Sequence, residues 1–171
     1  WLDNLDMEVP TTVEEFMDVA RAFQFDDPDG NGRDDTIGYT SIAEDPSHNY
    51  WPTMLKGATF GFTEVDGEWV DGFTRPNMKE AVARIKQGYD EGWIDPEIFT
   101  NTTSTARGKF VNGQAGIFSY WSGAWGRAMQ TLTEGNNPDG IAFPLPPVEG
   151  VHYWNRVSVP ESITTAAEDP E

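Results

Sequence analysis

The apolar residues near the start of the chain recur with the period of an α-helix. They stand three or four residues apart, at Val13, Phe16, Met17, Ala20 and Phe23. Thr12 immediately precedes this run. Glu15 stands three residues after Thr12, which is the spacing of a capping box. The pattern predicts an amphipathic helix from residue 13 to about residue 25, with its acidic side chains in water.

A second strong helical period covers residues 76–91. Its apolar positions are Met78, Ala81, Val82, Ile85 and Tyr89. A proline opens this segment at Pro76 and a glycine follows it at Gly92, as is typical of helix ends. Weaker patterns predict helices over residues 49–57 and 122–132. A third weak pattern follows the polar run 101–104 and extends to residue 111.

Three other segments are typical of β-structure. Residues 37–42 are β-prone, and residues 115–120 form a mostly apolar run that we expect to be a buried strand. Residues 62–71 predict a hairpin that turns at Asp66 and Gly67. The proline-rich remainder predicts extended loops, and no internal repeat occurs. We therefore expect residues 1–171 to form a single compact α/β unit (mixed α+β), rich in helices around a small sheet.

The composition of the chain excludes several classes of function. The chain has 29 acidic and 11 basic side chains and a net charge of −18. This balance argues against nucleic-acid binding, because neutralising phosphates needs clustered lysines and arginines. The absence of cysteine excludes disulfides, thiolate zinc sites and cysteine nucleophiles. With 37% hydrophobic residues, the chain has enough apolar surface to build a core.

A calcium site is the strongest chemical prediction. Asp27, Asp29 and Asn31 place oxygen side chains at alternate positions, and a glycine stands sixth in the loop. The carbonyl of Arg33 and the side chain of Asp35 would complete the ligands of a hard cation. The twelfth position is a glycine instead of a glutamate, and the next segment is strand-like, so the pattern is not a full helix-loop-helix hand. We expect structural calcium there; the alternative is a solvated acidic turn.

Several segments resemble one protein family in the right order. They are residues 1–5 (WLDNL), 9–16 (VPTTVEEF), 27–36 (DPDGNGRDDT), 88–97 (GYDEGWIDPE) and 110–118 (FVNGQAGIF). Together they are similar to the bacterial extracellular solute-binding proteins of family 1, the oligosaccharide-binding, lipoprotein-type receptors of ABC importers. Members of this family that bind calcium in the loop often carry glutamate after the residue that matches Asp35, whereas this chain has Thr36.

This resemblance implies a fold, partners and a location. The expected fold is one lobe of a type II periplasmic-binding-protein-like receptor, excised from a longer chain whose second lobe closes over the ligand. The implied partners are a carbohydrate solute, that second lobe and an ABC permease in the membrane. The implied location is the extracellular face of the cell membrane, through a lipid anchor, or the periplasm.

Sugar binding needs flat apolar faces beside hydrogen-bonding groups. Tyr120, Trp121 and Trp125 follow a predicted strand at its carboxyl end, where α/β sheets present ligands. Asn49 and Trp51 occupy the corresponding place after the strand around residue 39. We predict that these five residues contact the ligand.

Two other classes of function remain open. A carbohydrate-active enzyme would use two carboxylates, but no pair stands out, and a turn explains Asp95 and Glu97. A calcium-stabilised carbohydrate-binding or adhesion module would usually repeat its loop, and this chain has one. We therefore expect non-catalytic capture of an oligosaccharide. Core packing is the expected role of the three remaining tryptophans considered, Trp69, Trp93 and Trp154.

Overall fold

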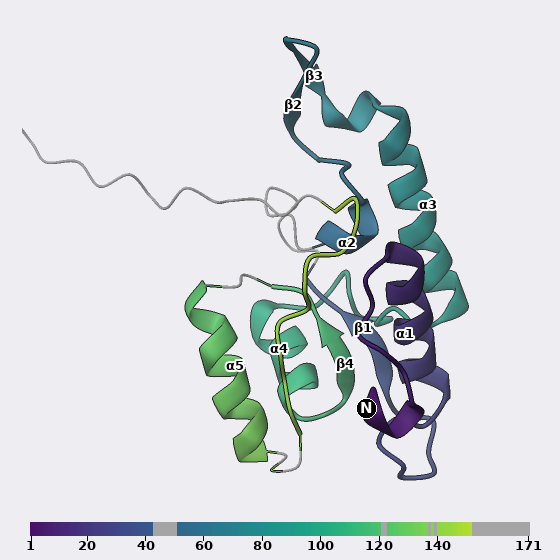
Figure 1. The fold of residues 1–171 in the computed structure, drawn as a ribbon, viewed down its shortest axis with the longest axis vertical. Coiled ribbons are helices and arrows are strands. Elements are labelled where there is room, and N and C mark those ends of the chain that lie inside the picture. The colour runs from purple at the N-terminus through teal and green to yellow at the C-terminus, as the bar shows by residue number, and fades with distance from the viewer. Residues whose placement is uncertain (43–50, 121–122, 137, 139, 152–171) are drawn as a thin grey trace, which may run out of the picture.

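A computed structural model describes residues 1–42, 51–120, 123–136, 138 and 140–151 (Figure 1). In chain order the helices and strands are α1 (Val13–Phe25), β1 (Ile37–Thr40), α2 (Pro52–Leu55), β2 (Phe62–Val65), β3 (Glu68–Asp71), α3 (Pro76–Glu91), α4 (Thr103–Val111), β4 (Ala115–Phe118) and α5 (Gly123–Asn136). Two 3-10 turns, Asp3–Leu5 and Gly72–Thr74, accompany them. The predicted helices and strands are present, with α5 ending four residues later than expected, α2 shorter, and β1 and β4 each ending two residues earlier. The strand expected to be buried, β4, is only partly buried beyond Ala115.

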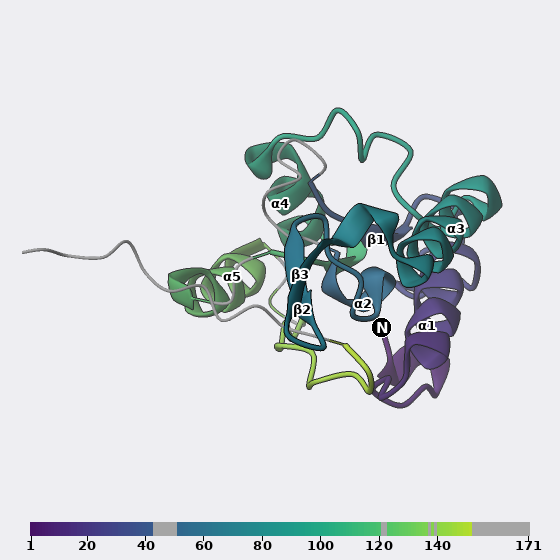
Figure 2. The same cartoon turned by 90° about the horizontal axis from the view of Figure 1, so that it is seen from above.

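Strands β1 and β4 form a small parallel sheet. Tyr39 of β1 lies opposite Ile117 of β4, and on its other side Tyr39 makes an isolated parallel bridge to Ile94. Helices α1 and α3 lie on one side of this sheet, and α4 and α5 lie on the other (Figures 1 and 2). The mixed α/β fold predicted from the sequence is therefore confirmed.

Local chemistry accounts for the ends of the elements. At the start of α1, the amide of Glu15 donates to the Thr12 hydroxyl over 3.1 Å, and the Thr12 amide donates to the Glu15 carboxylate over 3.2 Å. At the end of α3, Gly92 adopts the left-handed conformation with φ of 86°. Asp66 and Gly67 turn the hairpin with φ of 53° and 84°, as a type I′ turn requires.

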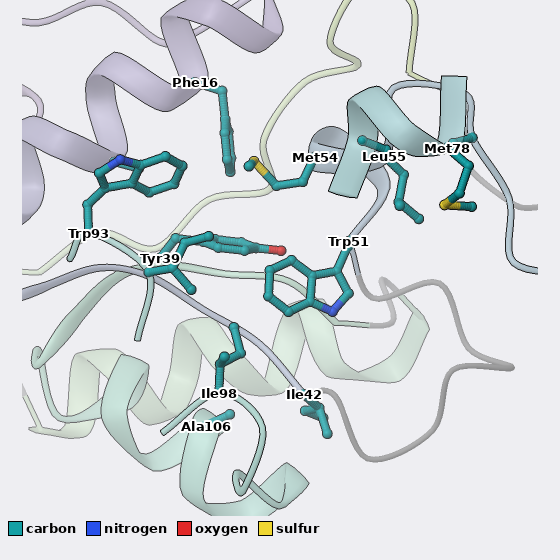
Figure 3. Packing of buried hydrophobic residues seen from close by; sticks show 14 residues of the cluster. Phe16, Tyr39, Ile42, Trp51, Met54, Leu55, Met78, Trp93, Ile98 and Ala106 are labelled. Carbon is teal, nitrogen blue, oxygen red and sulfur yellow. The ribbon is translucent and has the colours of Figure 1, made fainter. Parts of the chain in front are cut away.

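The core forms where the sheet meets α1, α2 and α3 (Figure 3). The ring of Tyr39 packs edge-on against Phe16 at 5.5 Å and against Trp51 at 5.4 Å, measured between ring centroids. Trp93 is fully buried, as predicted. The side of β1 that faces α1 has no room for a larger residue at Gly38.

The packing prediction for Trp69 was wrong. Its side chain, on β3, is 70% exposed. Within the described residues, strands β2 and β3 pair only with each other, and no second layer covers that face. Trp154 lies outside the described residues. Among the helices that are described, none is both long and apolar enough to cross a lipid bilayer.

Candidate functional site

The two segments predicted to hold a ligand leave the sheet at the same edge. Because β1 and β4 are parallel, their carboxyl ends lie together. The amide of Ser119 donates to the carbonyl of Thr40 over 3.3 Å, and the hydroxyl of Ser41 donates to the carbonyl of Ser119 over 3.2 Å. The fold therefore brings residues 40–41 into direct contact with residue 119.

The structure describes the surroundings of only some of the five predicted ligand residues. Tyr120 is partly buried, and its ring stacks on Phe118 with centroids 5.7 Å apart. Trp51 is only 6% exposed and lies in the core beside Tyr39. Asn49 and Trp121 lie outside the described residues, as does the side chain of Trp125 at the start of α5. Ligand contact by these five residues stays a prediction.

A buried ion pair stands at the same edge, where a third segment runs beside β1. Asp95 follows the bridge residue Ile94 and is fully buried. Its carboxylate accepts hydrogen bonds from Lys109 Nζ at 2.7 Å, from the Thr40 hydroxyl at 2.6 Å and from the Asn101 amide at 2.8 Å. This network joins the carboxyl end of β1 to α4.

The network shifts the titration of both charged groups. Burial alone would raise the pKa of Asp95, but the hydrogen bonds from Lys109, Thr40 and Asn101 outweigh it and hold that pKa below its usual value. Burial would likewise lower the pKa of Lys109, and its ion pairs with Asp95 and Glu97 raise it instead. The pair is therefore charged at neutral pH.

Sequence reasoning missed this network. The turn assigned to Asp95 is present, since one of its oxygens accepts from the Glu97 amide at 3.0 Å. Its main partner, Lys109, is 14 residues further on and belongs to helix α4. No local spacing marks such a pair, so only the fold reveals it.

The predicted calcium loop is closed on itself by hydrogen bonds. The carboxylate of Asp27 accepts from the backbone amides of Asn31 and Gly32, each over 3.0 Å. The side-chain amide of Asn31 donates to Asp29 at 2.8 Å and to Asp35 at 3.1 Å. Gly32, in sixth place, has φ of 75°, which confirms that this position needs a glycine. Asp27, Asp29 and Asp35 thus all contact Asn31, Asp27 through the backbone amide and the other two through the side chain.

The loop offers oxygen atoms that suit a calcium ion, but in this structure they bond to neighbouring groups of the loop. Asn31 Oδ1 accepts from the Arg33 amide at 2.8 Å, and the Arg33 guanidinium lies 3.8 Å from Asp35. Thr36 is buried and donates to the carbonyl of Phe23 at 2.8 Å, so it faces α1 and is not a ligand. Across the described part of the chain, no three His, Cys, Asp or Glu side chains are grouped as a metal site.

A small parallel sheet between helices places the fold in the α/β class, in which ligands bind at the carboxyl edge of the strands. Residues 2–166 match the family model of the bacterial extracellular solute-binding proteins. The chain belongs to this family, which is one of binding proteins and not of enzymes.

Three similar proteins illustrate the relationship. The polygalacturonan/rhamnogalacturonan-binding protein YtcQ of Bacillus subtilis is 30% identical over 120 residues, which are 69% of this chain and 24% of YtcQ. An HMO-binding, ABC-transporter-associated solute-binding protein of Bifidobacterium longum infantis is 27% identical with a TM-score of 0.64, over 88% of this chain and 32% of that one. An EF-hand mutant of the S. pneumoniae ABC-transporter substrate-binding protein FusA, in complex with fructo-nystose, is 27% identical with a TM-score of 0.57, over 68% and 25%. The chain spans about a quarter of the length of the curated relatives it matches.

Proposed function

We propose that the protein containing this chain is the substrate-binding component of a bacterial ABC importer and captures an oligosaccharide without transforming it. The observation that carries this proposal is the contact of residues 40–41 with residue 119 at one sheet edge. Both predicted ligand segments start from that edge. Relatives named for polygalacturonan and for fructo-oligosaccharides support a carbohydrate as the solute.

The proposal extends to the parts of the receptor that this chain does not contain. Since the chain spans about a quarter of its relatives, we assign it to one lobe, with the opposite wall of the cleft supplied by a second lobe. A lipid anchor on the extracellular face, or a periplasmic location, would place the receptor beside its permease.

A glycan array with the complete protein, run together with an assay for reducing ends, tests the proposal. We expect saturable binding to a subset of oligosaccharides and no new reducing ends, because the chain belongs to a family of binding proteins. New reducing ends would support the enzyme alternative. The absence of binding to any glycan would overturn the proposal.

We also propose that residues 27–35 bind calcium, with a structural role. The side chains of Asp27, Asp29, Asn31 and Asp35 supply hard oxygen donors, and the Arg33 carbonyl is a fifth. Asn31 now turns its amide nitrogen to Asp29 and Asp35, so binding requires a half-turn of that amide to present Oδ1. The relative FusA, whose structure was determined as an EF-hand mutant, supports the proposal. The ion would tie the end of α1 to the start of β1.

We expect calcium to raise the melting temperature of the protein. An ion at a hundred times its dissociation constant contributes about 2.7 kcal/mol to stability, which is several degrees for a chain of this size. Differential scanning calorimetry with calcium and with a chelator measures the effect. Asp29→Asn should remove it, whereas Asp34→Asn, the same charge change at an exposed loop position, should retain most of it. Identical melting curves with calcium and chelator would refute the site.

A further inference from the structure

One face of the β2–β3 hairpin carries two aromatic side chains and two carboxylates. Phe62 pairs with Asp71 across the hairpin, and Glu64 pairs with Trp69. Because side chains alternate along a strand, these four residues share one face. Phe62 and Trp69 are each 70% exposed. We name Phe62, Glu64, Trp69 and Asp71 the hairpin face.

The hairpin does not need this face for its own attachment. Its base is held by the rings of Phe60 and Phe73, whose centroids are 5.4 Å apart, and by a backbone hydrogen bond from Gly72 to Gly61. A Cβ at Gly72 would lie 2.1 Å from the carbonyl oxygen of Thr59, so the base is also tightly packed. Two large exposed aromatic residues beyond that base mark a contact surface.

The charge of the hairpin restricts what can bind there. Residues 62–71 contain four acidic side chains and no basic one. Such a surface repels oligouronates, nucleic acid and anionic membranes. Aromatic faces offer stacking to sugar C–H surfaces, and carboxylates accept hydrogen bonds from hydroxyl groups. Neutral oligosaccharides present both the C–H surfaces and the hydroxyl groups that such a face can bind.

The hairpin also lies on the same side of the molecule as the carboxyl edge of the parallel sheet. Strand β1 starts after the loop at the bottom of Figure 1 and runs upward, and the hairpin projects at the top beyond α2. In the view from above, β2 and β3 lie over the middle of the molecule, between α4 and α3 (Figure 2). The hairpin therefore stands beyond the sheet edge from which the predicted ligand segments leave.

We propose that the hairpin face is a distal subsite for neutral oligosaccharides, which contacts sugar units beyond those held at the sheet edge. This inference rests on the proposed oligosaccharide-binding function. It adds a specificity: the receptor prefers long neutral chains over short ones and over acidic ones.

Calorimetry on the complete protein tests the subsite with fructo-, gluco- and galacto-oligosaccharides, each as a disaccharide and an octasaccharide, and with an oligogalacturonate octamer. We expect Trp69→Ala to weaken octasaccharide binding about tenfold, as for other aromatic anchors, and disaccharide binding less than twofold. Phe62→Ala should act in the same way. The control is Val82→Ser, which removes an exposed apolar side chain from α3 and should leave both affinities unchanged.

The other outcomes separate the two proposals. A wild-type protein that binds only oligogalacturonate, or a Trp69→Ala protein with unchanged octasaccharide affinity, would overturn the subsite and leave the proposed function intact. Light scattering that shows Trp69→Ala changing the oligomeric state, with glycan affinity unchanged, would overturn it in favour of a contact between copies. Failure to bind any glycan would overturn the proposed function and the subsite with it.

Discussion

Replacement of Asp95 by alanine is expected to lower the free energy of unfolding by about 3–5 kcal/mol, the usual cost of removing one partner from a buried ion pair. The substitution removes the buried counter-charge of Lys109, whose side chain is only 14% exposed, and leaves Lys109 paired only with the exposed Glu97. It also removes the acceptor of the buried Thr40 hydroxyl and the nearest acceptor of the Asn101 amide. Equilibrium urea unfolding followed by tryptophan fluorescence measures the loss.

Glu97 provides a matched control for Asp95. It makes an ion pair with the same Lys109 over the same 2.7 Å, but its side chain is 68% exposed. Solvent screens such a pair, so Glu97→Ala should cost less than about 1 kcal/mol. A double variant, Asp95→Ala with Lys109→Met, should recover part of the stability that Asp95→Ala loses, because no buried charge is then left without a buried counter-charge. Equal losses from Asp95→Ala and Glu97→Ala would contradict the role given to burial.

The shifted pKa values define the pH range in which this pair stabilises the fold. Because the folded-state pKa of Asp95 is lowered, its contribution is complete above its unfolded value of about 3.9 and is lost as the pH falls through the lower folded value. The pKa of Lys109 is raised, so its contribution is complete below its unfolded value of about 10.4 and is lost above the folded one. The stabilisation therefore spans the whole neutral range and fails only in strong acid or strong base.

The elements that could be predicted from the sequence are those whose cause is local. The capping box at Thr12 and Glu15 acts over three residues, and the turn at Asp66 and Gly67 acts over two. Gly92 ends α3 through its own backbone conformation. Each of these signals lies within the element that it defines, so a single sequence is enough to identify it.

The candidate site depended on contacts that are distant in sequence. The contact between residues 40–41 and residue 119 follows from the parallel pairing of β1 with β4, and the sequence patterns did not indicate which strands are neighbours. The exposure of Trp69 was missed because the same alternation occurs in a covered sheet and in a bare hairpin. Burial depends on the neighbouring layer, and strand patterns do not reveal which layers are present.

The close approach of α1 to β1 leads to a second large effect, at Gly38. A Cβ at this position would lie 1.9 Å from the carbonyl oxygen of Ala20 and 2.9 Å from that of Trp93. Both obstacles are backbone atoms, so Gly38→Ala cannot be accommodated by turning a side chain, and α1 must move away from the sheet. We expect it to cost about 3 kcal/mol or more, at the upper end of overpacking substitutions.

Gly108 tests whether this cost comes from the contact or from the loss of glycine. It lies within α4, and a Cβ there would meet nothing within 4 Å. Gly108→Ala should therefore raise stability by about 0.5–1 kcal/mol, because alanine favours the helix. Urea unfolding of both variants should give shifts of opposite sign. A Gly38→Ala protein as stable as the wild type would mean that α1 and β1 are further apart than the structure shows, and that the carboxyl edge of β1 is not held in place by this contact.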